Sequence, residues 1–303
     1  MITEAYAFAD LIFTCKEKIK TLPPYHAIRY AAWLRFACHN AGLDPQNAFS
    51  GLLSFRNGIT PIQEGEQIRV RLYLTEEELK TLPLLLNHLS VTQAEGAFNP
   101  ATLELTAVLD PLQASGGRRP GTGTFTLFEP GLLREELEMA AALNTFTLNF
   151  SVPLRLTLPP GQKHRNFSER ERFCEESFFI NDPRAPQRLL ECVRTFERPD
   201  PNEAAAASRE QCTGGFVFSG APLSQELTVA SSTLTWTEQR YNRERQTSMG
   251  GLTGILKLRG RPGRESLLRL VAGQYLGTGK ALRSGLGFYR IMELEGQHLI
   301  PLL

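Results

Sequence analysis

The part of the chain best suited to chemistry is a glycine-rich segment close to its C-terminal end. Five glycines lie between residues 273 and 287, with Lys280 and Arg283 among them. Glycine permits positive φ angles and a close approach of the backbone, so such a segment can point N–H groups and cations at a phosphate. The nucleotide-binding spacing GxxxxGKS or GxxxxGKT does not occur. The segment predicts a phosphate-binding loop, and a glycine-rich connection that only packs against its neighbours is the alternative left open.

Arginines and aromatic residues precede this segment. Residues 236–246 combine three arginines with a tryptophan and a tyrosine. A guanidinium fork suits phosphate oxygens and an aromatic ring suits a stacked base, a combination typical of RNA binding. A charged hairpin with Trp236 in the core is the alternative. The residues expected to bind RNA in the two segments are Arg240, Tyr241, Arg243, Arg245, Gly277, Gly279, Lys280, Arg283, Ser284, Gly285 and Gly287.

Charge is unevenly distributed along the chain. The 33 Lys and Arg against 32 Asp and Glu give a net charge of +1, which argues against a simple polycationic nucleic-acid binder. From Trp236 onward, however, there are 11 Lys or Arg and 5 Asp or Glu, whereas the preceding residues have 22 and 27. The basic last fifth is therefore where a phosphate backbone is expected to bind.

Apolar periodicity predicts the elements that must position these residues. In the first half, strands are predicted at residues 5–18, 67–74 and 102–109, with a further strand at 124–128, and helices at 25–40 and 76–89. Thr75 and Glu78 form a capping box at the start of the second helix. Residues 43–66 are expected to form a loop. In the second half, strands are predicted at 145–158, 227–237, 251–258 and 287–294, and helices at 131–143, 184–196 and 264–276.

This order of elements predicts an α+β protein with two tandem ferredoxin-like (RRM-like) domains. The first half follows a β-α-β-α-β pattern with the further strand at 124–128, and the second half follows a β-α-β-β-α-β pattern, although no sequence repeat is visible. The expected boundaries are 1–140 for the N-terminal domain and 141–303 for the C-terminal domain. Residues 114–123 and 200–208 are expected to be a loop and a surface linker.

Several functional classes are disfavoured by the residues. Five cysteines without a CxxC pair favour a reduced, cytoplasmic protein, and no apolar run is long enough to span a membrane. No metal and no cofactor are expected, since Cys38-His39 lacks a second ligand pair. No GxSxG motif is present, and the neighbouring carboxylates at 76–78 and 135–136 are expected on solvated helix faces.

Four segments together form a recognisable pattern: GTGKALRSGLGFYRI near the C-terminal end, the preceding WTEQRYNRERQ and MGGLTG, and the strand FTLNFSVPLRL. On these segments the chain resembles the CRISPR repeat-processing endoribonucleases of the repeat-associated mysterious protein superfamily. The segment LPPYHAIRYAAWLRFA also looks like the start of their first domain. The resemblance covers most of the chain but is specific only over roughly the last seventy residues.

The resemblance implies a metal-independent cleavage of CRISPR repeat RNA. The 2′-OH of the RNA would attack the adjacent phosphate and leave a 2′,3′-cyclic phosphate and a 5′-OH. The partners implied are precursor and mature guide RNA, together with CRISPR effector or adaptation proteins. Such a reaction needs a proton acceptor and donor, and a cation beside the phosphate.

Histidine is the first residue to consider for the proton transfers, and the chain has five. Relatives of this family often place their histidine at the start of the first helix, where His26 stands, and others place it just after that helix, near His39. Arg29 lies one turn after His26 and is expected to face the same cleft, next to Tyr25. The predicted catalytic residues are His26, His39, Tyr25 and Arg29, and the choice among His26, His39 and no catalytic histidine stays open.

Three other functions are compatible with the sequence. The first alternative is a non-catalytic subunit that binds CRISPR RNA in an effector complex. A second alternative is the processing module of a larger fusion with a reverse transcriptase and an integrase. A third is a small-molecule enzyme that uses the glycine-rich segment for a phosphate, which predicts an enclosed pocket and no binding of RNA.

Overall fold

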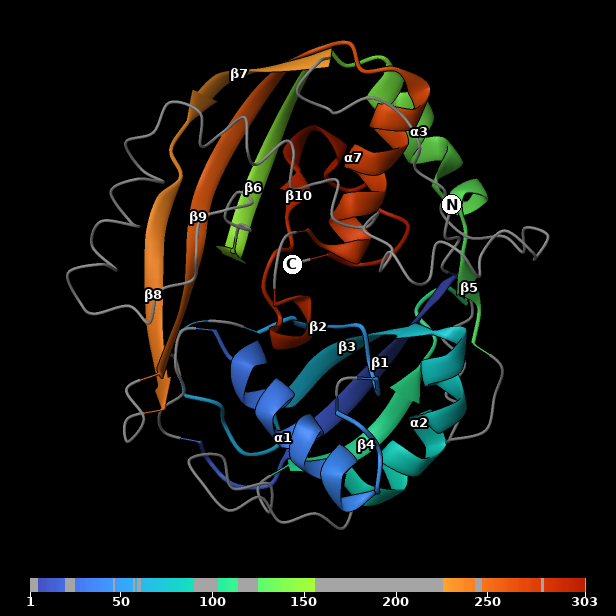
Figure 1. Cartoon of the computed structure of the whole chain (residues 1–303), viewed down its shortest axis with the longest axis vertical. Coiled ribbons are helices and arrows are strands. Elements are labelled where there is room, and N and C mark those ends of the chain that lie inside the picture. The colour runs from blue at the N-terminus through green and yellow to red at the C-terminus, as the bar shows by residue number, and fades with distance from the viewer. Residues whose placement is uncertain are drawn as a thin grey trace, which may run out of the picture.

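The chain forms two α+β halves stacked one on the other (Figure 1). The computed structural model describes residues 5–19, 25–45, 47–56, 58, 61–89, 103–113, 125–155, 226–242, 247–278 and 281–302. In Figure 1 the first half lies below and the second half above.

The first half is a β-α-β-β-α-β unit. Its elements are β1 (Tyr6–Cys15), α1 (Ala27–Asn40), β2 (Gly51–Ser54), β3 (Gln67–Thr75), α2 (Glu76–Leu89) and β4 (Leu103–Leu109). The strands pair antiparallel in the order β2-β3-β1-β4, and the short β5 (Leu127–Phe128) also pairs with β1. This strand order is that of a ferredoxin-like domain and confirms the predicted fold class.

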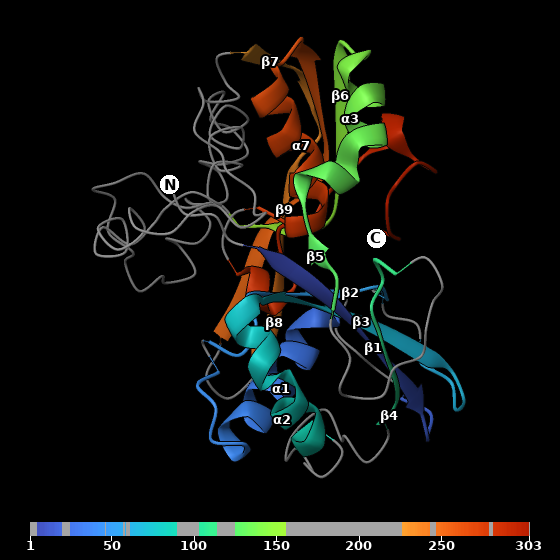
Figure 2. The same cartoon turned by 90° about the vertical axis from the view of Figure 1, so that its right-hand side faces the viewer.

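Both helices of this half cover the same face of its sheet (Figure 2). Side chains alternate along a strand, so Ala9, Leu11 and Phe13 of β1 point to the helix side together with Val70 and Leu72 of β3. All of these side chains are buried against α1 and α2. The face opposite the helices is left to contact the second half.

The start of α2 shows the predicted capping box. The backbone N–H of Thr75 donates to Glu78 Oε2 at 2.8 Å, and the N–H of Glu78 donates to Thr75 Oγ1 at 3.3 Å. The Glu78 carboxylate also accepts the hydroxyl of Ser50 and is 5% exposed. The prediction that this carboxylate lies on a solvated face is therefore wrong, because capping draws it under the sheet edge.

The second half repeats the strand order of the first. Its elements are β6 (Thr145–Leu154), β7 (Leu227–Ser232), β8 (Thr235–Asn242), β9 (Thr247–Gly260), α7 (Arg264–Leu276) and β10 (Arg290–Ile291). The sheet order is β10-β6-β9-β7, and β8 pairs with the other end of β9. The turn η2 (Pro130–Leu133) and the helix α3 (Arg134–Ala141) precede β6, and α3 packs against α7. The domain boundary after residue 140 stays a prediction.

Three predicted elements differ from the structure. The strand β2 occupies part of the expected loop, and all four of its residues are buried, so no alternation of apolar and polar residues marks it. The strand expected at 227–237 is split into β7 and β8, because their common partner β9 passes through Gly254 at a φ of 122° beside Thr233. The last strand is only Arg290–Ile291, followed by the turn η6 (Met292–Leu294).

An aromatic cluster joins the two halves. On the face of the first sheet that its own helices do not cover, the Phe8 ring lies 5.2 Å from that of Tyr73 and 4.9 Å from that of Phe128. The Tyr73 ring stacks on Phe288 of the second half at 5.0 Å, and Phe128 contacts Tyr275 of α7 at 5.3 Å. One continuous apolar core therefore runs through the junction.

Buried polar contacts tie the C-terminal segment to both halves. Asp10 of β1 pairs with Arg71 of β3, both without exposed surface, and Arg71 Nη1 donates to the carbonyl of Pro301 at 2.9 Å. Glu136 of α3 accepts the hydroxyl of Tyr275 and the N–H of Leu299. Glu136 is only 2% exposed, so its predicted solvated position is wrong, because it satisfies these donors instead.

Some predicted segments lie outside the described residues, namely the loop at 114–123, the helix at 184–196 and the linker at 200–208. In the part of the chain that is described, no helix is both long and apolar enough to cross a bilayer. The same residues contain no group of three His, Cys, Asp or Glu side chains that would hold a metal ion.

Candidate active site

His26 stands at the start of α1, where the first half meets the second. Its side chain has no exposed surface, and Nε2 lies 2.7 Å from the carbonyl oxygen of Gly58. A carbonyl only accepts hydrogen bonds, so this contact holds the proton on Nε2 and leaves the lone pair on Nδ1. Nδ1 is buried and has no hydrogen-bond partner among the described residues. The arrangement presents a proton-accepting nitrogen of fixed tautomer.

The surroundings of His26 keep its imidazole neutral. Burial is the largest cause of a pKa below the usual 6.5, and the nearby Arg56 cation lowers the pKa further. The hydrogen bond to Gly58 acts in the opposite direction but does not outweigh burial. A neutral imidazole with a free lone pair is the form that a general base requires.

His39 is separated from His26 by the length of α1. It lies exposed in the last turn, thirteen residues on, which at 1.5 Å per residue is about 20 Å away. Only one of the two histidines can therefore serve one phosphodiester. The structure places His26, and not His39, beside the junction of the two halves.

Tyr25 joins α1 to the second sheet. Its hydroxyl forms side-chain hydrogen bonds with Thr237 of β8 and Thr253 of β9, which also bond each other at 2.8 Å. Burial raises the pKa of Tyr25 despite these bonds, so the phenol stays protonated at neutral pH. Arg29 is half-buried one turn after His26. The sequence did not single out either threonine, since both belong to a sheet distant along the chain.

The described part of the glycine-rich segment packs onto the first half. Arg283 Nε donates to the carbonyl of Phe49 at 2.8 Å, and Arg35 of α1 donates to Ser284 Oγ at 2.9 Å. Gly285 has a φ of 77°, and a Cβ there would overlap the Cβ of Ala27 at the start of α1. The segment thus seats directly against the helix end that carries His26.

A second glycine shapes the segment from within. Gly287, at a φ of 84°, donates its N–H to the carbonyl of Pro153 at 2.9 Å, and its own carbonyl accepts the N–H of Thr278 at 2.7 Å. A Cβ on Gly287 would overlap the carbonyl oxygen of Thr278. Gly277, at a φ of 76°, ends α7. These glycines satisfy packing demands, which is the alternative that the sequence left open beside phosphate binding.

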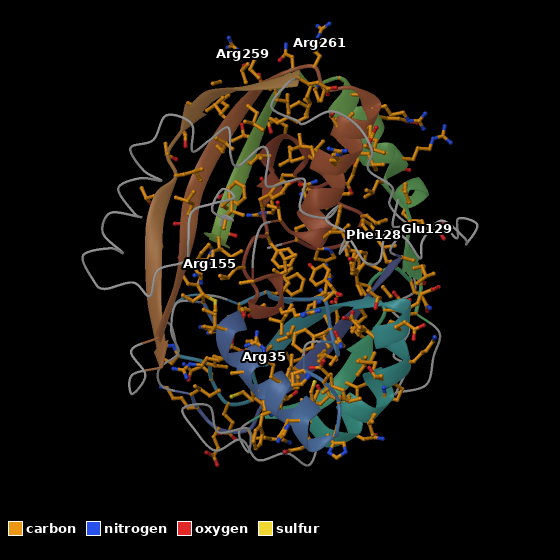
Figure 3. The ribbon with its side chains drawn as sticks, viewed as in Figure 1. Arg35, Phe128, Glu129, Arg155, Arg259 and Arg261 are labelled. Atoms are coloured by element: carbon orange, nitrogen blue, oxygen red, sulfur yellow. The ribbon has the colours of Figure 1, made fainter. Side chains whose placement is uncertain are left out.

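Arg35 is a residue that the sequence predicts to face away from the site, yet it contacts the glycine-rich segment. Nine residues after His26, it is not on the same helical face, and α1 alone places it away from the site. It reaches the glycine-rich segment because that segment passes along the side of α1. Figure 3 shows Arg35 on α1 and Arg155, next to the end of β6, on opposite sides of the junction.

Several predicted RNA-binding residues are not described at the level of their side chains. Arg240 and Tyr241 lie in β8, and at these two positions the structure describes the backbone alone. Arg243, Arg245, Gly279 and Lys280 lie outside the described residues. Their predicted contacts with RNA stay predictions.

Comparison with known proteins bears on the fold. No family model matches the chain, and no curated protein matches it. A partial Cas6-RT-Cas1–Cas2 complex contains a chain that matches with a TM-score of 0.62 and 16% identity, over 99% of this chain and 48% of that one. A Cas6-RT-Cas1–Cas2 complex matches with the same score and identity, over 99% of this chain and 30% of that one. A Thermus thermophilus Cas6 matches with a TM-score of 0.45 and 17% identity, over 95% of this chain and 98% of that one.

The chain thus spans about half of one protein with a similar structure and about a third of another. Identities this low bear on the fold and leave the activity to be argued from the site. The chain therefore has a tandem ferredoxin-like fold of the kind found in Cas6-RT-Cas1–Cas2 complexes.

Proposed function

We propose that the chain binds CRISPR repeat RNA and cleaves it, with the 2′-OH of the RNA as nucleophile. The observation that carries this proposal is His26, a neutral imidazole next to the glycine-rich segment whose Nδ1 has no partner among the residues that the structure describes. The fold shared with Cas6-RT-Cas1–Cas2 structures and the family resemblance of the C-terminal motifs supply the substrate class.

In the proposed reaction, His26 Nδ1 accepts the proton of the 2′-OH as that oxygen attacks phosphorus. The bond from phosphorus to the leaving 5′-oxygen breaks and that oxygen takes a proton from water, so the products are a 2′,3′-cyclic phosphate and a 5′-OH. Arg29, one turn on, is the proposed cation beside the phosphorane oxygens, and Tyr25 holds α1 against β8 and β9. No step requires a metal ion. Because His26 is fully buried, the residues that cover Nδ1 must move before RNA reaches it, while the bond from Nε2 to Gly58 is kept.

The decisive experiment replaces His26 by Gln. Glutamine can still donate to the Gly58 carbonyl but cannot act as a base, so the hydrogen bond is kept while the proton acceptor is lost. Cleavage of a cognate repeat in EDTA should fall by about 10²-fold or more, with binding within a few-fold of wild type. The control is His39→Gln at the exposed end of α1, which should cleave normally. Undiminished cleavage by His26→Gln would refute the assignment, and loss in His39→Gln alone would move the site.

A non-catalytic function is the second candidate, and the full burial of His26 favours it. In that case the chain would bind and hold CRISPR RNA without cutting it. Mapping RNA ends after incubation of the wild-type protein with repeat RNA in EDTA separates the two functions. Retained binding with no new ends would support the non-catalytic function.

We further propose that the chain acts as one part of a larger assembly. The structures with a similar fold include a reverse transcriptase, Cas1 and Cas2, and this chain spans only part of the matched proteins. Precursor and mature guide RNA, and CRISPR effector or adaptation proteins, are the proposed partners.

A further inference from the structure

The described cations of the basic last fifth fall into two groups, those used in contacts within the fold and those exposed to solvent. Arg269 is buried, Arg283 donates to Phe49, and Arg290 pairs with Glu295 at 3.8 Å. These three side chains are therefore already used in contacts within the protein. The cations in this part whose described side chains are exposed are Lys257, Arg259, Arg261 and Arg264.

These four cations, here called the distal basic cluster, gather at one end of the second sheet. Lys257 and Arg259 alternate with the buried Leu256 and Leu258, so both side chains lie on the outer face of β9, about 6.6 Å apart along the strand. Arg261 follows directly, and Arg264 begins α7. Figure 3 shows Arg259 and Arg261 at the end of the molecule that is farthest from Arg35.

The neighbours of the cluster on the sheet carry hydroxyl groups. Arg259 lies opposite Thr145 of β6 and Thr228 of β7. Lys257 lies opposite Thr147 and Ser231 on the same two strands. Three of these hydroxyls already donate within the fold, Thr145 to Asn144, Thr147 to Glu293 and Thr228 to the Arg259 carbonyl. The two cations are therefore the main donors that this part of the sheet offers to a ligand.

The acidic residues near the cluster already have other partners. Glu226 accepts the N–H of Gly263 at 2.8 Å, Glu265 pairs with the buried Arg269 at 3.2 Å, and Glu293 accepts the N–H of Thr147 at 2.8 Å. Among the described residues, none of the four cations forms an ion pair. Glu226 and Glu293 bond neutral donors and keep their negative charge, so four cations against these two carboxylates leave a net charge of +2. A surface with this excess of positive charge fits a polyanion.

The cluster is connected to the candidate site by a single strand. Thr253 of β9 bonds Tyr25, and Arg259 lies six residues farther along, about 20 Å at 3.3 Å per residue. A nucleic-acid strand with a rise of about 3.4 Å per nucleotide covers this distance in about six nucleotides. An RNA held at the junction reaches the cluster only if it extends beyond the site by that length.

We propose that the distal basic cluster binds the phosphate backbone of a single-stranded RNA segment that flanks the segment held at the junction. This inference rests on the proposed function for the identity of the polyanion. Cationic side chains on this face bind phosphate oxygens rather than base edges, so the contact is independent of sequence. The surface extends the footprint of the protein along the RNA.

The test compares a short repeat RNA with RNAs extended by twelve nucleotides at either end. Each RNA carries a 2′-deoxy nucleotide at the cleavage position, and binding is measured in EDTA over a salt series. The variant carries Lys257→Gln, Arg259→Gln, Arg261→Gln and Arg264→Gln. The matched control carries Lys16→Gln, Lys18→Gln, Lys80→Gln and Arg134→Gln, which removes four exposed cations elsewhere.

Wild type and control should bind one of the extended RNAs more tightly than the short RNA. The cluster variant should bind that extended RNA and the short RNA with equal affinity. In the cluster variant, the slope of log K against log salt for that extended RNA should become shallower by up to about 3. This value corresponds to four lost phosphate contacts at about 0.7 each. Two half variants, Lys257→Gln with Arg259→Gln and Arg261→Gln with Arg264→Gln, should each show part of this change.

The outcomes separate this inference from the proposed function. Equal binding of short and extended RNA by wild type, or an unchanged preference in the cluster variant, would overturn the inference. Cleavage of an all-ribose short RNA in EDTA is measured in parallel. If this RNA is not cleaved, the proposed nuclease activity is wrong, but the binding measurement on the distal basic cluster still stands.

Discussion

At the scale of the residue, His26 links the proposed chemistry to stability. Burial lowers the pKa of its imidazole below 6.5, whereas in the unfolded chain it titrates near that value. Below about pH 6.5 the unfolded state therefore binds more protons than the folded state. The free energy of unfolding should be undiminished above this pH and fall as the pH drops toward the folded-state pKa.

Urea unfolding at pH 5, 6, 7 and 8 measures this effect. Between pH 7 and pH 5 the wild type should lose more stability than the His26→Gln variant, which cannot titrate at this position. An equal loss in both proteins would show that the imidazole is not held neutral by the fold.

The residue type at the site could be predicted from the sequence, but its environment could not. A histidine after two prolines at a helix start is visible in the chain, as are Tyr25 and Arg29 around it. The contact that fixes its tautomer comes from Gly58, thirty-two residues later and outside any regular element. Nothing local to His26 indicates that its side chain is buried.

At the scale of the element, the glycine-rich segment depends on the missing side chain of Gly285. A Cβ at this position is strained at a φ of 77° and overlaps Ala27. Gly285→Ala should lower the free energy of unfolding by about 2–4 kcal/mol, from backbone strain and overpacking together.

The matched control is Gly296→Ala. Gly296 has a φ of 86°, but a Cβ there would meet open space, so only the backbone strain applies, about 1–2 kcal/mol. Urea midpoints of the two variants compare them directly. Equal losses would mean that Gly285 does not seat the segment on α1.

Elements with a clear period of apolar residues could be predicted from the sequence, whereas strands whose bounds depend on pairing with a distant strand could not. The helix α2 was predicted with its observed bounds because its capping box and apolar stripe are both local. The strand β2 is four residues long and buried throughout, so its identity depends on pairing with β3. The split between β7 and β8 is likewise set by β9, not by residues 227–237 themselves.

At the scale of the whole molecule, the shared core predicts that the two halves unfold together. Phe8 and Tyr73 of the first half pack with Phe288 and Tyr275 of the second in one continuous cluster. The chain has two tryptophans, Trp33 in α1 and Trp236 in β8, one in each half.

Single-tryptophan variants, Trp33→Phe and Trp236→Phe, report on the opposite halves by fluorescence. After correction for the stability of each variant by circular dichroism, both reporters should follow the same single transition in urea. A first-half signal that persists after the second-half signal is lost would contradict the shared core.

The global charge of +1 was a poor guide to binding because it averages unlike regions. The sequence located the basic fifth but could not separate structural from exposed cations there. Arg269 and Arg283 are used by the fold, while Lys257 and Arg259 alternate outward from a strand. That division needs the packing of α7 and the docking of the glycine-rich segment.

The aromatic junction also constrains how the chain can be made. During synthesis the first half is complete well before Phe288 leaves the ribosome, and until then Phe8, Leu53 and Tyr73 have no second half to cover them. A nascent first half would display an apolar sheet face to water, the kind of surface that drives self-association. Translation speed through the second half, and protection of that face by chaperones, therefore become determinants of yield, and splitting the gene between the halves would leave a product prone to aggregate.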